Sequence, residues 1–511
     1  MKNTPKKNLA WITLSFMMVA AVASIRSLPS MAVFGLGSVS LYLLPALVFF
    51  VPVSLVGAEL GTGWNGGIYG WIKQAFGERL GFFAMWFLWI QVVTWYPIVL
   101  AFAAGTTAYL FNPELAKNGL FTVVVINVLY WGSTLVALGG LSKLSKLSSW
   151  FMICGTLVPA ATLIILGAAW LLTGHSSATP LTVDSLVPNI FKSVTTGHQK
   201  LHPGAWAEFT GILGGLVLIV SNFLAFAGIE MNAIHASSLA NPQKQMPKAI
   251  LIAAVLIVVI FVPPTLAISF VVPADSTSLT AGVMQAYADF FHQFHMDWAI
   301  KFMAALLIIG ALGGVLSWTA GPSAGLLAVG KSGSLPLWWQ VTNKNGVQKN
   351  ILILQGVLVT VLSLIYVVVP DVSTAFWMLS AIAAQMYLII YLFMFSAVLK
   401  LRKTQPNVKR GYKAPAVHFW AYLGIASSLF TFFLGFVPPN QYKTMSPVVY
   451  VAILIGGLLL FGLPPFIFYA YRKPEWQVIS KGEADKYSAA LQDMETEADD
   501  PTENKTDTTT K

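Results

Sequence analysis

The 511-residue sequence has few charged residues and almost no cysteine. Only 10% of its residues are charged and 56% are hydrophobic, whereas soluble proteins carry about 25% charged residues. Such a chain must hide most of its surface from water, and the lipid bilayer is the solvent that allows this. The single cysteine, Cys154, excludes an intrachain disulfide. The sequence also lacks a Walker P-loop, so nothing in it supports the use of ATP.

Long apolar runs recur along the chain, and each is long enough to cross a membrane as a helix, which takes roughly 20 residues. The sequence therefore predicts an all-α polytopic membrane protein with about twelve transmembrane helices. Their expected limits are 9–35, 39–60, 79–111, 120–140, 148–173, 211–236, 249–272, 298–328, 350–369, 373–400, 416–437 and 447–471.

Three regions follow from these spans. We expect a cytoplasmic N-terminus over residues 1–8, a transmembrane domain over 9–472 and a cytoplasmic tail over 473–511. The tail is polar, acidic and poor in large apolar residues, so most of it is expected to be disordered. A solvated end is the simpler interpretation of the tail, and a plug or regulatory segment is the alternative.

The basic residues are distributed unevenly between alternate loops. If the N-terminus is cytoplasmic, most lysines and arginines lie in inner segments. The outer segments hold only Lys117, Lys192, Lys200, Lys301 and Lys443. This asymmetry is the positive-inside pattern, and it predicts that both termini face the cytoplasm of the cell membrane. The net charge of +10 is therefore a signal of topology and does not indicate binding to nucleic acid.

Two of the expected spans are interrupted. The first contains "VASIRSLPSMAVFGLG", with an arginine and a proline, and the sixth contains "AFAGIEMNA", with a glycine and a glutamate. Hydrophobic segments broken at matching places in two halves of a chain indicate the substrate site of a transporter. We expect residues 24–30 and 226–231 to be non-helical and to face each other across a central cavity. The alternative is that proline and glycine only kink these helices.

Three motifs resemble those of the amino acid–polyamine–organocation superfamily. They are "GAELGTGWNGGIYGWIKQAFGERLGFFAMW" from Gly57, "FAGIEMNAIHASSLANPQKQMPKAI" from Phe226 and "SWTAGPSAGLLAVGKSGSLP" from Ser317. The "GPS" of the third motif and the following "KNGV" are similar to the bacterial glutamate:GABA antiporter group. One departure is the stretch from Arg26 to Pro29, where those exchangers carry an aromatic-acidic-aromatic-proline run.

The resemblance implies a five-plus-five inverted repeat with broken helices 1 and 6, followed by two extra helices. It also implies a secondary active transporter, not an enzyme, that exchanges amino acids for amines by alternating access and is coupled in function to an amino-acid decarboxylase. The alternatives are a proton-coupled or facilitative amino-acid permease and, in a different class, a channel or transporter-like sensor. The expected partners are a small amino acid or amine and the lipid bilayer; the oligomeric state stays open.

Two charged residues in the interrupted helices are the first candidates for the site. A carboxylate such as Glu230 is costly inside a membrane. It could bind the substrate amine, accept a proton or accept hydrogen bonds from unwound backbone amides. Arg26 could bind an anionic group of the substrate, or it could form an ion pair with Glu230. The ion pair is the favoured of these two, because opposite charges in one low-dielectric cavity attract each other.

The remaining candidates surround these charges. The backbone around Ser27, Ser30 and Met31 is expected to hold the substrate carboxylate, and Gly228 to allow close approach. Aromatic side chains could close the site, and the candidates are Phe226, Trp95, Tyr96 and Trp318. Pro29 and Glu59 are assigned structural or gating roles. No histidine or cysteine spacing predicts a metal site, and no cofactor is expected.

Overall fold

The computed structural model describes residues 10–140, 150–151, 153–188, 213–440 and 446–479. Eleven helices in these ranges are long and apolar enough to cross a membrane. They are Gly37–Gly63, Glu78–Phe111, Gly119–Leu138, Cys154–Leu172, Leu213–Asn232, Pro242–Val271, Trp298–Lys331, Lys349–Val368, Val372–Thr404, Val417–Leu434 and Pro447–Ala470. These correspond to expected spans two to twelve, and the first expected span is divided into shorter helices. The prediction of an all-α polytopic membrane protein is confirmed.

Several spans consist of more than one helical element. The second runs through α3 (Gly37–Pro45), a π-helical turn η2 (Ala46–Phe50) and α4 (Val51–Gly63). The fifth joins the π-helical η4 (Ile153–Leu157) to α9 (Val158–Leu172). The ninth joins α16 (Lys349–Ser363) to α17 (Ile365–Val368), and the last joins α20 (Pro447–Gly462) to α21 (Pro464–Ala470).

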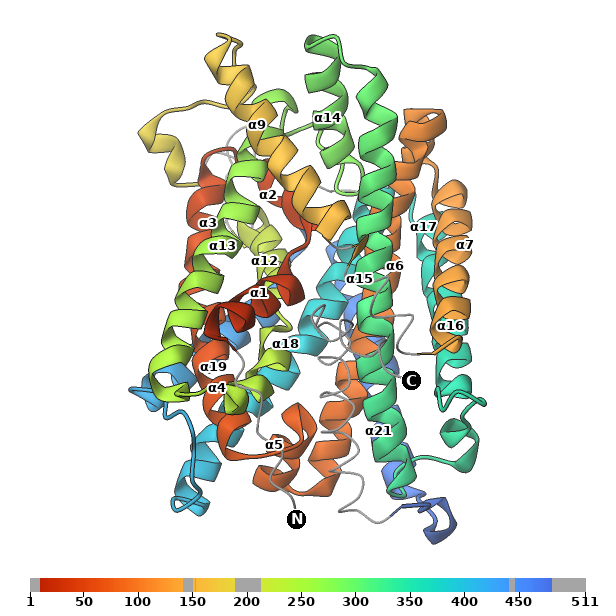
Figure 1. Ribbon diagram of the computed structural model, residues 1–511. Coiled ribbons are helices and arrows are strands. Elements are labelled where there is room, and N and C mark those ends of the chain that lie inside the picture. Colours follow the sequence, from red (N-terminus) through yellow and green to blue (C-terminus); the bar gives the residue numbers. More distant parts are fainter. Residues whose placement is uncertain (1–9, 141–149, 152, 189–212, 441–445, 480–511) are drawn as a thin grey trace, which may run out of the picture.

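The spans pack as two groups of helices (Figure 1). On one side, α6 (Glu78–Phe111) and α7 (Gly119–Leu138) pack against α15 (Trp298–Lys331) and α16. On the other side, α3 and α4 pack with the divided first and sixth spans and with α13 (Pro242–Val271). Between them stands α18 (Val372–Thr404), which contacts α4, α6 and α19 (Val417–Leu434). Spans that are five apart in the sequence, such as the third and the eighth, therefore lie together, as an inverted repeat predicts.

The first span breaks at Ala23 and Ser24. Helix α1 (Trp11–Val22) ends there, and both residues are extended, with ψ angles of 109° and 121°. A 3-10 turn, η1 (Ile25–Ser27), and the short α2 (Leu28–Ala32) follow at once. The expectation that 24–30 would be non-helical is therefore wrong for most of that stretch. Pro29 lies in the first turn of α2, where a missing N–H costs nothing, so proline begins a helix here.

The sixth span breaks at Ala227 and Gly228. The 3-10 turn η6 (Val217–Ile219) and α12 (Val220–Phe226) lead to Ala227, which is extended, and Gly228 follows with φ of 104°. A left-handed φ of this size is strained for any residue with a side chain. A 3-10 helix, η7 (Ile229–Ser238), continues from the break. The break is thus shorter than the expected 226–231, because 3-10 geometry resumes at Ile229.

Shorter elements lie at the two ends of the membrane body. Helix α5 (Gly67–Phe76) and η8 (Leu337–Gln340) are at the end predicted to face the cytoplasm, and α14 (Gly282–Gln293) and η3 (Pro113–Lys117) are at the opposite end. The start of the predicted tail turns back onto the body, since the amides of Val478 and Ile479 donate to the Lys331 carbonyl at 2.8 and 3.2 Å. The predicted N-terminal segment and the tail beyond Ile479 lie outside the described residues.

Candidate functional site

The two interrupted spans are bonded directly to each other. The hydroxyls of Ser30 in α2 and Ser221 in α12 lie 2.9 Å apart. The side-chain amide of Asn222, which is fully buried, donates to the Met31 sulfur at 3.0 Å and to the Leu41 carbonyl at 2.8 Å. The side chains of Ser30 and Met31, two predicted site residues, therefore join the broken helices. Ser27 lies one turn before Ser30, and its carbonyl accepts the Ser30 hydroxyl at 2.6 Å.

Glu230 is held by three donors beside the second break. Its Oε1 accepts from the Tyr387 hydroxyl at 2.8 Å, and its Oε2 accepts from the Tyr391 hydroxyl at 2.6 Å. The Gly228 amide, freed by the break, donates to Tyr391 at 2.8 Å and to Glu230 Oε2 at 3.2 Å. Both tyrosines lie on α18, one turn apart, with their rings stacked. The carboxylate therefore ties the break to α18, which is the backbone-binding role that the sequence left open.

Arg26 has no such partner, although only 6% of it is exposed. Within the described part of the chain it makes no hydrogen bond or ion pair, and its Nε is buried without an acceptor. The favoured ion pair with Glu230 is therefore wrong. The two charges face different neighbours: Glu230 meets α18, whereas the guanidinium lies over the Trp95 ring of α6, 5.4 Å from its centroid. The sequence could not predict this divergence, because it depends on where α6 and α18 stand.

Two indole rings connect Arg26 with the second break. Trp95 and Trp318, on α6 and α15, have centroids 6.3 Å apart, and both are partly exposed. Trp318 lies in turn against Gly228, where a Cβ would stand 2.9 Å from the ring. Four predicted site residues thus form one line: Arg26, Trp95, Trp318 and Gly228. This line runs from the first interrupted span to the sixth across the face of the α6–α15 pair.

Three other predicted residues lie in neighbouring regions of the core. Tyr96 is fully buried and packs on Tyr130 of α7, with its hydroxyl 3.4 Å from that of Thr319. Phe226 is buried among the phenyl rings of Phe50 and Phe261. The Tyr96 ring also packs edge-on against Trp95 of the Arg26–Gly228 line, with the two centroids 5.8 Å apart. Pro29 packs at the start of α14, where a Cβ on Gly282 would meet its ring at 2.8 Å.

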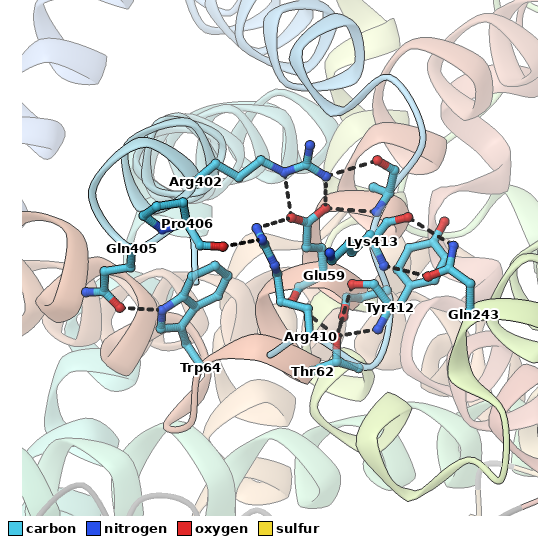
Figure 2. Close-up of polar contacts among 12 residues, drawn as sticks. Glu59, Thr62, Trp64, Gln243, Arg402, Gln405, Pro406, Arg410, Tyr412 and Lys413 are labelled. Atoms are coloured by element: carbon cyan, nitrogen blue, oxygen red, sulfur yellow. Dashed lines mark hydrogen bonds and ion pairs between the residues drawn. The ribbon is translucent and has the colours of Figure 1, made fainter. Parts of the chain in front are cut away.

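A second polar cluster surrounds Glu59 at the end of α4 (Figure 2). Its carboxylate has no exposure and accepts from Arg402 Nε at 2.7 Å, from Arg402 Nη2 at 2.6 Å and from the Ala414 amide at 2.8 Å. Arg410 Nη1 is a further donor at 3.3 Å. Four donors on one buried carboxylate fix the end of α18, and the loop after it, against α4.

The same loop is fastened at two more points (Figure 2). The Tyr412 amide donates to the Thr62 hydroxyl at 3.0 Å, and Gln243, at the start of α13, exchanges two hydrogen bonds with the Lys413 backbone at 2.8 and 3.2 Å. Burial beside Glu59 raises the pKa of Tyr412 to about 12, so this phenol is neutral at physiological pH. The loop therefore joins α4, α13 and α18 at one end of the membrane body.

The most informative residues of both clusters escaped the sequence reasoning. Tyr387 and Tyr391 have i, i+4 spacing on an apolar helix, a spacing that places two hydroxyls on one face. In the sequence, Arg402 and Arg410 are visible only as two of the many basic residues of the inner segments. For metals, no group of three or more histidine, cysteine, aspartate or glutamate residues in the described ranges could hold an ion.

Comparison with known proteins agrees with this architecture. The model of the amino acid permease family matches residues 9–459. An uncharacterized transporter of Legionella pneumophila is 37% identical over 91% of this chain and 97% of its own. A glutamate/gamma-aminobutyrate antiporter of Lactococcus lactis is 30% identical over 88% of this chain and 87% of its own, and a probable agmatine/putrescine antiporter of that species is 24% identical over 81% and 84%. The chain is therefore a multi-pass membrane transporter that belongs to the amino acid permease family.

Proposed function

We propose that the protein exchanges an amino acid for an amine formed from it by decarboxylation, across the cell membrane and by alternating access. The observation that carries this proposal is the pair of breaks at Ala23–Ser24 and Ala227–Gly228, which belong to spans five apart and lie on helices bonded to each other. Breaks of this kind expose backbone groups in mid-membrane, where a transporter binds its substrate.

The similarity to a glutamate/gamma-aminobutyrate antiporter over most of both chains supports exchange as the mode of transport. In such an exchange the amino acid enters the cell, and the amine that is left after its decarboxylation leaves the cell. Combined with a cytoplasmic decarboxylase, such a cycle consumes protons inside the cell. The functional partner of the transporter would then be that decarboxylase.

A proton-coupled permease is the second candidate, and Glu230 is the observation that favours it. A carboxylate buried in mid-membrane is a natural proton acceptor. Its three donors, from Tyr387, Tyr391 and Gly228, tie the carboxyl group to α18 and to the break. A carboxylate held in this way is better suited to keeping the sixth span joined to α18 than to releasing and taking a proton in each cycle.

The Glu59 cluster lies at the end of the molecule predicted to face the cytoplasm. Its ion pairs join α4, which packs with the interrupted spans, to α18 and the following loop. We propose that these contacts hold the inner side closed and separate when it opens. Both termini are cytoplasmic in this proposal, as the distribution of lysine and arginine predicts.

The test is efflux of preloaded radiolabelled substrate from proteoliposomes. An exchanger releases label only when a substrate is present outside, whereas a permease releases it without one. A panel of amino acids and their amines, at acidic and neutral pH, identifies the exchanged pair. Release of label into substrate-free buffer at the same rate would contradict exchange and support the permease.

A further inference from the structure

Arg26 is the only lysine or arginine among the described residues that is buried as a whole residue. A guanidinium has five N–H donors and no means of losing its charge in a protein. Burying such a group without a partner is costly, so the arrangement is expected only where an anion occupies the site for part of the time. Its neighbours do not supply that anion. Trp95 offers a ring face, and the Tyr366 hydroxyl is committed to the Pro97 carbonyl at 3.2 Å.

The carboxyl group of Glu230, which is also buried in the interrupted spans, already has hydrogen-bond partners. Glu230 has three donors and is oriented toward α18, so it does not need Arg26. Among the described residues of the interrupted spans, the buried carboxyl group therefore has hydrogen-bond partners and the buried guanidinium has none. A substrate bound between the interrupted spans and the α6–α15 pair would meet the guanidinium from the side of the Trp95–Trp318 rings.

We propose that Arg26 is the subsite for the distal, side-chain carboxylate of the transported amino acid. This step rests on the proposed exchange function. Decarboxylation removes the α-carboxylate and leaves the distal carboxylate in place. An exchanger that carries both molecules must recognise a group that both possess, and the distal carboxylate is the only anion that they share. Arg26 is matched to this group, because a planar guanidinium binds a carboxylate through two parallel hydrogen bonds.

The assignment defines a substrate class. The protein would carry ω-carboxylates with an amino group, such as glutamate and γ-aminobutyrate, and would discriminate against neutral side chains. Amines that lack any carboxylate, such as putrescine, would be poor substrates. The Trp95 ring covers one face of the guanidinium and keeps water from it, which strengthens the charge-assisted bonds that the N–H groups form in the guanidinium plane.

Two amides of glutamate can show which of its two carboxylates the protein recognises, the distal one or the α-carboxylate. Isoglutamine keeps the distal carboxylate and carries an amide at the α-position, whereas glutamine has the opposite arrangement. Ligand-induced thermal stabilisation of the purified protein gives an affinity for each compound without requiring transport. We expect the wild type to bind isoglutamine and γ-aminobutyrate more tightly than glutamine.

The variant Arg26→Gln should weaken binding of isoglutamine, γ-aminobutyrate and glutamate by about tenfold to a hundredfold, the effect of losing one charge-assisted contact. Binding of glutamine should change little. Arg26→Lys keeps the positive charge but loses the two parallel N–H donors, so its affinity for these ligands should lie between those of Arg26→Gln and the wild type. As a matched control, Arg79→Gln also removes an arginine from above a ring, that of Phe466 at 5.5 Å, but at an exposed position outside the site. It should leave all four affinities unchanged.

The unliganded Arg26→Gln protein supplies a second readout. Removing a buried cation that has no partner should raise the melting temperature, whereas removing half of an ion pair would lower it. A lower melting temperature with unchanged ligand preference would overturn the proposal. Equal losses for glutamine and isoglutamine would overturn it as well, because they would place the α-carboxylate at Arg26. Stabilisation by chloride, measured against gluconate, that disappears in Arg26→Gln would identify an inorganic anion as the occupant and would also overturn it.

Failure of the proposed function is a separate outcome. Counterflow in proteoliposomes reports exchange, and thermal stabilisation reports binding. If the wild type binds γ-aminobutyrate through Arg26 but releases label without external substrate, exchange is wrong and the subsite stands. If exchange occurs and Arg26→Gln keeps the wild-type preference for isoglutamine, the subsite is wrong and the exchange function stands.

Discussion

Glu59 and Arg402 form two parallel hydrogen bonds, of 2.7 and 2.6 Å, between the end of α4 and the end of α18. The carboxylate is fully buried and the arginine side chain is one-quarter exposed. A bidentate pair of this kind fixes both the distance and the relative orientation of the two helices. It is therefore the contact whose loss should affect this end of the membrane body most.

Replacing Arg402 should destabilise the protein measurably. Arg402→Gln leaves Glu59 with Arg410 and the Ala414 amide, so we expect a loss of about 3 kcal/mol in the free energy of unfolding, the lower end for breaking a buried pair. Thermal or denaturant unfolding in detergent measures it. The control is Glu114→Gln, which removes an exposed pair with Lys117 and should have no measurable effect. Equal stability of both variants and the wild type would contradict the structural role of the cluster.

The two tyrosines that hold Glu230 should not be equivalent. Tyr391→Phe takes a partner from both the Glu230 carboxylate and the Gly228 amide, whereas Tyr387→Phe affects the carboxylate alone. Leaving a buried polar group unsatisfied costs about 1–3 kcal/mol. We therefore expect Tyr391→Phe to lower both stability and transport rate more than Tyr387→Phe. Unfolding and uptake measurements on both variants show which substitution has the larger effect. A larger effect of Tyr387→Phe would contradict the role given to Tyr391.

Gly228 should not tolerate a side chain. Its φ of 104° disfavours an L residue, and a methyl group would stand 2.9 Å from Trp318. Backbone strain of this kind costs about 1–3 kcal/mol, so Gly228→Ala should reduce stability and transport together. Gly456→Ala in α20 is the control, because no atom lies within 4 Å of its Cβ position. It should be neutral or stabilising by up to about 1 kcal/mol.

The fifth and eighth spans cross with backbone against backbone at Gly155 and Gly310. A Cβ on Gly155 would clash with the Gly310 amide nitrogen, and backbone cannot move aside as a flexible side chain can. We expect Gly155→Ala to yield little folded protein, as judged by size-exclusion chromatography after extraction. Gly132→Ala, whose Cβ position is open, should behave as wild type. Normal yields of Gly155→Ala would mean that the crossing is looser than described.

Orientation in the membrane can be tested with single cysteines. In a Cys154→Ala background, single cysteines would replace two exposed lysines, Lys403 at the end of α18 and Lys117 in η3. A membrane-impermeant maleimide added to intact cells should label Lys117→Cys alone, and Lys403→Cys should react only after the cells are opened. Labelling of Lys403→Cys in intact cells would reverse the proposed topology.

The sequence predicted the spans well, because each depends only on local hydrophobicity. It also located both interruptions, since a proline or glycine beside a charge is visible without any tertiary knowledge. Their extents differed from expectation for a local reason: Pro29 occupies the first turn of α2, and 3-10 geometry resumes at Ile229 directly after Gly228. A helix-breaking residue marks the region of a break, but the neighbouring residues determine where the helix begins again.

The partners of the charges could not be predicted in this way. Glu230 is bonded to tyrosines 157 and 161 residues away, and Glu59 to an arginine 343 residues away. Electrostatic attraction suggested that Arg26 and Glu230 would meet, but hydroxyls of α18 satisfy the carboxylate instead. Which of several possible donors reaches a buried carboxylate depends on how α4, α6 and α18 are placed, and a hydrophobicity pattern carries no information on that placement.

The bonding of the Gly228 amide gives the sixth span an unusual mechanical property. This amide is held by the Tyr391 hydroxyl and the Glu230 carboxylate, and Tyr391 belongs to α18. The break in the sixth span is thus held in place by a side chain of the neighbouring helix α18. If one half of the sixth span rotated about the break, its internal helical hydrogen bonds would stay intact, but the bonds from the Gly228 amide and Glu230 to α18 would break. The rotating half and α18 must therefore move together if these bonds are to be kept. The Tyr387 and Tyr391 hydroxyls would then have to part from Glu230 whenever the sixth span moves relative to α18.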